Sequence, residues 1–329
     1  MGRKKDWKKR RKRILRRKLL RAAVLLVMLF MVIGMIELAV VGVKKLAGLF
    51  EKEKPAASDK VEQIEKEDKT KEPEKKEPEE QKDESTPQLV SNTPQKLTRE
   101  QSIAQITKMA ETYSEMQEIL EHQAEYPDEL LLMLANNPET LEFVKNYPKL
   151  QGTVNNADQL KKIREGSIPL LIQWDERWGY GAYGDSNIAI SGCGPTCLAM
   201  VAAGLRQDTS VTPLAVANYA QEQGYYSEAG TSWDLMTTGC EQFGIQGEEL
   251  ALGESSVKEQ LESGHPIICS MGPGTFTTEG HYIVLSGWKN GMIELHDPNS
   301  VSRSKKLWAY GELEPQIKNM WVYLSLIHI

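Results

Sequence analysis

The amino-acid sequence predicts an α+β fold for the C-terminal half of the chain, behind a membrane span and a long charged linker. In that half, helix-like periodicity comes first and short apolar runs typical of strands come after it. Two of these runs are separated by Lys289-Asn290-Gly291, which predicts a hairpin turn. Helices followed by antiparallel strands are the α+β arrangement.

The N-terminus predicts a membrane anchor. Residues 1–21 carry 13 Lys or Arg and one acid, and residues 22–43 are apolar except for Glu37. Twenty-two such residues are long enough to cross a bilayer, and the basic block is expected to stay in the cytoplasm. A cleaved signal peptide is the competing interpretation. Because no small-residue cleavage site follows the apolar run, we expect an uncleaved single-pass anchor with the rest of the chain outside.

Residues 44–98 predict a disordered linker, because from Glu51 to Glu84 they are nearly all Glu, Lys, Asp and Pro. Such a segment buries too little apolar surface to fold. The basic block of residues 1–21 is also compatible with nucleic-acid binding. That interpretation is the poorer one because a membrane span comes directly after it, so we expect no nucleic-acid partner.

Residues 99–165 predict a small helical neck. Thr98 and Gln101 fit a capping box, and three X-Pro steps divide the later part of the neck into short segments. The expected helices span 99–123, 128–136 and 139–146. The neck shows no obvious chemistry, so we expect it to pack beside the next domain as scaffold.

The predicted domain spans residues 166–323. The expected elements are a strand at 168–172, helices at 194–205, 212–223, 231–243 and 255–263, and strands at 267–271, 281–288, 291–295 and 320–323. Residues 324–329, Leu-Ser-Leu-Ile-His-Ile, match what a transposon-type sequencing adaptor encodes when read in frame. We interpret these six residues as such an artefact, which would leave His328 without meaning.

Cys193 is the candidate nucleophile. It lies between Gly192 and Gly194 and is followed by Pro195 and an apolar helical pattern, so it predicts a tight turn into a helix. The positive end of the helix dipole favours a thiolate there, which is how a cysteine nucleophile is made. The alternative is a small cysteine in a capping turn with no chemical role.

His281 and Asp297 are the candidate base and orienting carboxylate. His281 begins one strand of the predicted hairpin and Asp297 comes just after the other, so pairing of the strands would bring them together. A histidine beside a thiolate transfers protons, and a carboxylate behind it holds its tautomer. His296 is the rival base, but as the neighbour of Asp297 it is expected to point to the opposite face. His265 fits a turn, and His122 lies in the neck.

Gln173 is the candidate oxyanion donor. It lies 20 residues before Cys193, and its side-chain amide could act with the Cys193 backbone N–H. The four cysteines, Cys193, Cys197, Cys240 and Cys269, show neither disulfide-scaffold nor zinc spacing. We expect free thiols, no metal and no cofactor.

Four ordered motifs resemble a known family. They are Gln-Trp-Asp-Glu-Arg-Trp (173–178), Gly-Cys-Gly-Pro-Thr (192–196), Gly-His-Tyr-Ile-Val-Leu (280–285) and Asp-Pro-Asn-Ser (297–300). Together they are similar to the bacteriocin-processing peptidase-like family, family thirty-nine of the cysteine peptidases, in the papain-like clan. Residues 230–236, Gly-Thr-Ser-Trp-Asp-Leu-Met, and the neck resemble a membrane-anchored Gram-positive subgroup.

The resemblance implies a papain-like cysteine peptidase fold, with Cys193 as nucleophile, His281 as base, Asp297 as orienting group and Gln173 as oxyanion donor. The namesake domains sit on export transporters and cut leader peptides inside the cell. This chain has one predicted span, no ATPase segment and a domain expected outside the membrane. The leader-peptide substrate therefore does not carry over.

Three functions remain open from the sequence. The first is a membrane-anchored cysteine peptidase acting on peptides or proteins outside the cell. The second is a cell-wall amidase or endopeptidase acting on peptidoglycan, although no wall-binding repeat is present in the sequence. The third is a non-catalytic peptide-binding module on the same fold. The presence of all four catalytic residue types favours an enzyme. The sequence does not define the scissile bond or the oligomeric state.

Overall fold

The computed structural model describes residues 93–155, 158–227 and 229–326, all within the unit Glu80–Ile329. The predicted anchor, the basic block, the linker up to residue 92 and His328 lie outside the described residues. In the described ranges, every helix is too short or too polar to cross a lipid bilayer.

The neck folds into four α-helices with a common apolar core. They are α2 (Arg99–Met109), α3 (Met116–Glu121), α4 (Asp128–Asn136) and α5 (Leu141–Leu150). The Thr98 capping box is present at the start of α2. The prediction of one helix over 99–123 is wrong, because the N–H groups of Thr112 and Tyr113 both turn back onto Met109 O. This break lets Met116 and Ile119 of α3 bury completely in the core.

The C-terminal part is built on one antiparallel sheet of six strands, ordered β5-β10-β6-β7-β8-β9. The strands are β5 (Ile245–Glu249), β6 (Ile267–Met271), β7 (His281–Lys289), β8 (Met292–His296), β9 (Leu307–Trp308) and β10 (Ile317–Ser325). Two small hairpins lie outside this sheet: β1 (Ala182–Tyr183) with β2 (Ser186–Asn187), and β3 (Tyr226–Ser227) with β4 (Gly230–Thr231).

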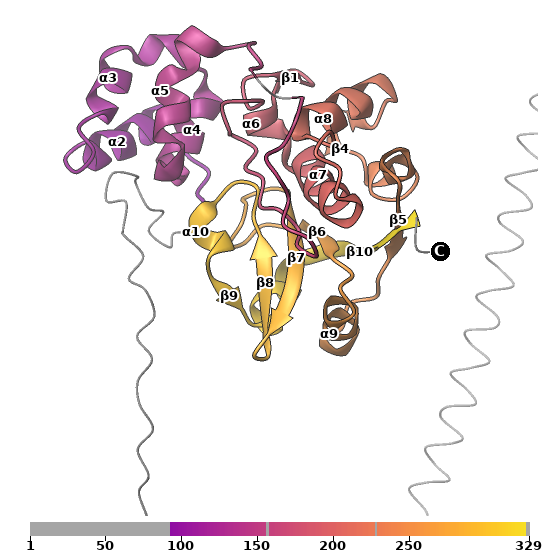
Figure 1. Ribbon diagram of the computed structural model, residues 1–329. Coiled ribbons are helices and arrows are strands. Elements are labelled where there is room, and N and C mark those ends of the chain that lie inside the picture. Colours follow the sequence, from indigo (N-terminus) through magenta and orange to yellow (C-terminus); the bar gives the residue numbers. More distant parts are fainter. Residues whose placement is uncertain (1–92, 156–157, 228, 327–329) are drawn as a thin grey trace, which may run out of the picture. The chain divides into compact units, whose positions relative to one another are not determined.

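Helices cover both faces of the six-stranded sheet (Figure 1). On one face, α7 (Cys193–Arg206) and α8 (Pro213–Glu222) form a core with Ile268, Val284 and Trp321. On the other face, α9 (Glu254–Glu262) and α11 (Tyr310–Leu313) share a core with the alternate strand residues, among them Ile267, Ile283 and Val322. Alternate residues of a strand point to opposite faces, so these near-continuous apolar runs supply two cores.

The predicted hairpin is confirmed. Asn290 and Gly291 join β7 to β8 with φ of 53° and 78°, and two residues with positive φ match the right-handed twist of paired strands. The α+β prediction and the four predicted strands at 267–271, 281–288, 291–295 and 320–323 are therefore present, with shifted ends. β10 continues to Ser325, and Leu324 and Ser325 pair with β5.

Two further predicted elements are wrong. Residues 168–172 form no strand, because the segment runs beside α7 with no ladder partner and Pro169 lacks a donor. Residues 231–243 form no α-helix. They fold as β4 and two short 3₁₀ turns, Trp233–Leu235 and Gly239–Phe243. A Cβ added at Gly239 would lie 3.1 Å from the Tyr225 ring, so this ring packs directly on the glycine backbone. That tertiary contact overrides the helical pattern of the sequence.

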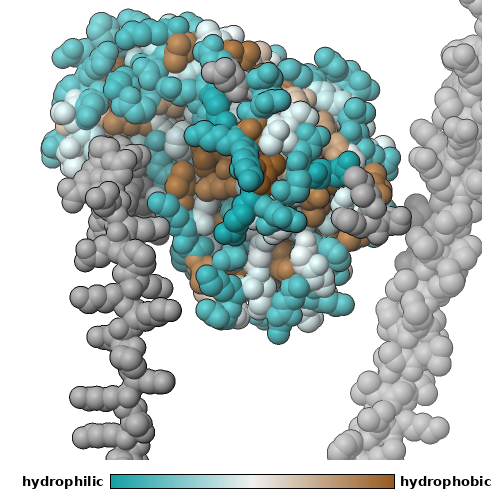
Figure 2. Space-filling model, viewed as in Figure 1, coloured by the Kyte–Doolittle hydropathy of each residue, from teal (hydrophilic) through white to brown (hydrophobic). Residues whose placement is uncertain are grey.

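The segment 158–172 follows the neck helix α5, precedes α6 (Ile188–Ser191) and runs over α7. Within this segment, Leu160 and Ile163 are buried in the core that contains α7, whereas the charged residues are exposed. The face seen in Figure 2 is mainly hydrophilic, and a stripe of hydrophilic residues divides its apolar surface. The segment thus closes the core over α7 and leads directly to Gln173.

Candidate active site

Cys193 is the first residue of α7, after the short helix α6 (Ile188–Ser191) and Gly192. Both flanking glycines are required by packing. A Cβ on Gly192 would collide with Ile188 O, and one on Gly194 would lie 2.9 Å from the Thr231 side chain. Cys193 is half-buried, whereas the other three cysteines are buried, and all four are free thiols. The local turn therefore places one thiol at the start of a helix and within reach of solvent.

His281 and Asp297 meet where β7 begins and β8 has just ended. His281 Nε2 lies 2.8 Å from Asp297 Oδ1, and both side chains are buried. Nδ1 is then the ring nitrogen left for Cys193, whose side chain is near enough to His281 to help raise the pKa of the ring. The structure thus brings the predicted base and carboxylate into direct contact and the predicted nucleophile close to the base.

Asp297 is held from three sides. Its Oδ1 accepts from the Asn299 N–H at 2.8 Å, and its Oδ2 accepts from Arg303 Nη1 at 3.1 Å. Arg303 is itself only 8% exposed and belongs to α10 (Val301–Ser304), whose N-cap is Ser300. Arg303 was not predicted from the sequence. The signal that could have found it is Ser300, a capping residue whose short helix returns position 303 toward Asp297.

Opposite charges control the titration of this pair. Burial alone would lower the pKa of His281, but the Asp297 carboxylate and, less strongly, the Cys193 sulfur outweigh it and raise that pKa to about 10. Burial likewise acts to raise the pKa of Asp297, but His281 and Arg303 hold it below its usual value of 3.8. At neutral pH the pair is therefore imidazolium and carboxylate.

Gln173 lines the same cavity as His281 and is 4% exposed. Its backbone N–H donates to Pro298 O at 2.8 Å, which ties it to the Asp297 loop. Its side-chain Nε2 donates to Ala189 O at 2.6 Å. Ala189 O is the carbonyl to which the Cys193 N–H would donate if α6 and α7 were one helix. The amide of Gln173 therefore donates to the carbonyl that a continuous helix would offer to the Cys193 N–H.

We expect Gln173→Ala to lower turnover by roughly 10²-fold, as when one oxyanion donor is lost. The alkylation rate of Cys193 should stay unchanged, because Gln173 has no part in forming the thiolate. Steady-state turnover and iodoacetamide labelling of the same preparations check this. Equal turnover in both proteins would remove Gln173 from the reaction.

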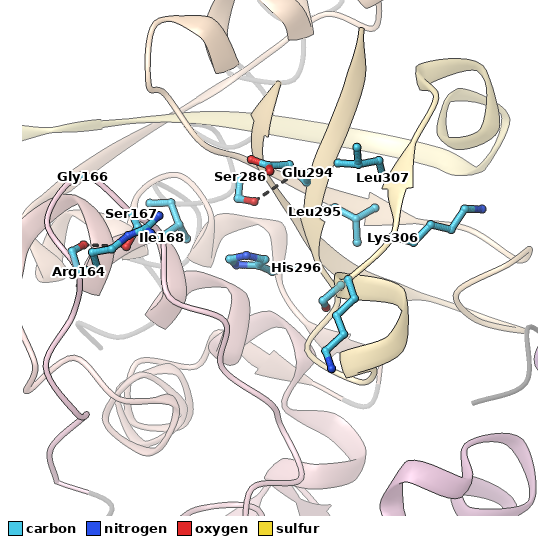
Figure 3. A pocket seen from close by; sticks show the side chains of 12 residues that line it. Arg164, Gly166, Ser167, Ile168, Ser286, Glu294, Leu295, His296, Lys306 and Leu307 are labelled. Carbon is cyan, nitrogen blue, oxygen red and sulfur yellow. Dashed lines mark hydrogen bonds between the residues drawn. The ribbon is translucent and has the colours of Figure 1, made fainter. Parts of the chain in front are cut away.

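His296, the rival base, lies elsewhere. Figure 3 shows its ring at a different pocket, of about 330 Å³, together with Arg164, Ser167 and Lys306. Burial lowers the pKa of His296 to about 4, so the ring is neutral at pH 7. His265 is held by Gln260 in the turn after α9, and His122 pairs with Glu125 in the neck. Of the described histidines, His281 is the one beside Cys193.

The neck also reaches the site, which was not predicted from the sequence. Glu139 is 7% exposed, and its carboxylate accepts from Ser300 Oγ, Val301 N and Ser302 N at 2.7–3.1 Å. An acid at these N–H groups stabilises the start of α10. Since α10 carries Arg303, Glu139 fixes the element that holds Asp297. The neck is therefore part of the support of the site.

We expect Glu139→Gln to destabilise the folded protein by about 1–2 kcal/mol, because a buried charge-assisted set of bonds is replaced by weaker ones. Thermal unfolding of the full chain measures this. Glu142→Gln is the matched control, since Glu142 is an exposed acid of α5 that pairs only with Lys145. An equal effect of the two changes would contradict the role of Glu139.

One comparison with known proteins gives a family match. Residues 166–326 match the Peptidase_C39 like family. No curated protein gives a significant match. Among solved structures, the chain is similar to the peptidase domain of Streptococcus ComA, a bi-functional ABC transporter involved in a quorum-sensing pathway. That pair has 18% identity and a TM-score of 0.33, over 48% of this chain and 98% of that one.

A second similar structure is a C39-like peptidase from Bacillus anthracis. It has 15% identity and a TM-score of 0.33, over 50% of this chain and 98% of that one. Both structural likenesses are distant. The family match covers all four motifs that carry Gln173, Cys193, His281 and Asp297. Residues 166–326 of this chain therefore form a domain of the Peptidase_C39 like family.

Proposed function

We propose that this chain is a membrane-anchored, extracytoplasmic cysteine peptidase that hydrolyses peptide bonds. The observation that carries the proposal is the buried His281, with Asp297 2.8 Å from one ring nitrogen and the Cys193 side chain near enough to help raise the pKa of the ring. This is the arrangement of nucleophile, base and orienting carboxylate that acyl transfer requires. The family of residues 166–326 supports it.

In the proposed reaction, the Cys193 thiolate attacks the carbonyl carbon of the scissile bond. The Cys193 N–H and the Gln173 amide stabilise the oxygen that becomes negative. His281 gives its proton to the amide nitrogen, the C–N bond breaks, and the amine leaves. A water molecule then gives a proton to His281 and attacks the thioester, which releases the carboxylic acid and restores the thiolate. Asp297 keeps the ring of His281 oriented throughout.

The membrane part of the proposal rests on residues 1–43. The 13 basic residues before Ala22 favour an N-terminus inside the cell, and the apolar run supplies the anchor. Protease added to intact protoplasts that express the chain should remove the C-terminal domain. If the domain is protected until lysis, the orientation is wrong.

The chemical part is tested with the full chain in detergent, using two substrates. One is a peptide mixture from a digested, denatured proteome, and the other is purified peptidoglycan. We expect new peptide N-termini that are absent with Cys193→Ser, because the serine lacks a thiolate. Cleavage confined to peptidoglycan would show a cell-wall hydrolase, and cleavage of neither substrate would show a binding module.

A further inference from the structure

A cavity of about 470 Å³ lies between the neck and the catalytic domain, beside His281. Its lining includes His281 and Gln173, but Cys193 is not part of it. The neck helix α4, the residues just before α2, and residues 276–280 ahead of β7 provide the walls. A cavity with one wall from outside the family domain, which begins at residue 166, therefore shares two residues with the candidate active site.

Four half-buried apolar side chains lie in the walls of this cavity. They are Leu97, Leu132 and Met133 from the neck and Ile190 from the domain. Phe276, which is 2% exposed, also lines the cavity, and its ring packs against Trp308 at 5.0 Å. Two exposed acids, Glu129 and Glu279, also line the cavity, and Glu279 is paired with Lys96 at 3.0 Å. The lining cation Arg303 is paired with Asp297. An apolar group bound here would cover surface that is now partly exposed to water.

The walls are held together across the two parts of the chain. Asn137 Nδ2 donates to Asn299 O at 2.5 Å, and Glu139 accepts from the start of α10. Trp174 Nε1 donates to the same Asn299 carbonyl at 3.0 Å. Because these bonds join the neck to the loop that follows Asp297, the cavity is formed before any ligand binds. A preformed pocket loses less entropy on binding.

The position of the cavity decides which part of a peptide it receives. The reaction proposed above requires His281 to give its proton to the leaving amine, so that amine lies on the His281 side of the scissile bond. The residues C-terminal to the bond remain attached to the amine. A cavity lined by His281 and not by Cys193 is therefore on the leaving-group side.

We propose that the cavity between α4 and residues 276–280 binds an apolar side chain, aliphatic or aromatic, from one of the first two residues C-terminal to the scissile bond. This assignment rests on the proposed function and adds the neck to the specificity-determining part of the enzyme. An apolar side chain in such a pocket is worth about 10- to 200-fold in discrimination between substrates.

The test uses the full chain and the digested-proteome peptide mixture, with cleavage sites read by mass spectrometry. We expect apolar residues to be enriched at the first or second position after the cleaved bond. In Met133→Lys and Leu132→Lys, this enrichment should be lost and the KM for the best-cleaved peptide should rise at least about tenfold. Met133→Ala, which keeps the wall apolar, should retain the enrichment with a smaller rise in KM.

Leu252→Lys is the matched control, since Leu252 is a 50% exposed leucine outside the cavity. It should keep the wild-type cleavage pattern. Alkylation of Cys193 by iodoacetamide, which needs no pocket, should be unchanged in every variant and shows that each one is folded. Enrichment confined to the positions before the cleaved bond, or none at all, would overturn the assignment alone. Absence of any Cys193-dependent cleavage would overturn the proposed function as well.

Discussion

Replacing His281 with Ala is expected to abolish peptide hydrolysis, with a fall in turnover of roughly 10⁴-fold or more, and to slow the alkylation of Cys193. Both effects are expected because His281 has two roles in the proposed reaction. In that reaction its positive charge pairs with the attacking sulfur of Cys193, and its proton goes to the leaving amine. Rates of iodoacetamide labelling at mildly acidic pH, followed by mass spectrometry of the cysteine peptides, measure the first effect.

The other cysteines make this measurement selective. Burial raises the pKa of Cys197 and Cys269 far above that of an ordinary thiol, and it raises the pKa of Cys240 to about 12. Cys193 is therefore expected to be labelled first in the folded wild type. His265→Ala is the control, because His265 contacts Gln260 and takes no part in the site. Equal labelling of all four cysteines, unaffected by His281→Ala, would leave a binding module on the same fold.

Replacing Asp297 with Asn is expected to lower turnover by about 10⁴-fold, because an amide no longer holds the required tautomer of the histidine ring. Cys193 should still react with iodoacetamide, since the carboxylate orients the base and does not attack the substrate. The pKa of His281 should fall, because Asp297 is the largest of the influences that raise it to about 10 and burial alone lowers it.

NMR titration of the His281 ring follows that pKa directly. In the wild type the ring should stay protonated up to about pH 10, and in Asp297→Asn it should lose its proton at lower pH. Ser304→Ala is a comparison variant near the same loop, because the Ser304 hydroxyl hydrogen-bonds the Asp297 backbone and Ser300 O. A wild-type titration near 6.5 would contradict the ion pair.

The same pair makes folding stability depend on pH, with opposite signs for the two partners. The raised pKa of His281 contributes stability that is complete below its unfolded value of 6.5 and is lost as the pH rises toward about 10. The lowered pKa of Asp297 contributes stability above 3.8 that is lost as the pH falls through its folded value. The free energy of unfolding of the wild type should therefore exceed that of Asp297→Asn most between pH 3.8 and pH 6.5. Urea unfolding across this pH range measures the difference.

Local chemistry alone determined much of the candidate site. Gly192, Gly194 and Pro195 define a turn and a helix start wherever they occur, so Cys193 at the beginning of α7 was predictable. Asn290 and Gly291 likewise determine a two-residue hairpin, and strand pairing then brings His281 to Asp297. These features follow from contacts between near neighbours in sequence or from strand register.

Tertiary packing decided the rest. Glu139 and Val301 are 162 residues apart, and nothing in the local pattern of the neck indicates that this acid caps α10. The same holds for the cavity between α4 and residues 276–280, whose walls come from both parts of the chain. Residues 168–172 have the apolar pattern of a strand, yet they run beside α7 without a ladder partner. A pattern shows that a side chain is buried, but which distant surface buries it depends on how whole elements pack.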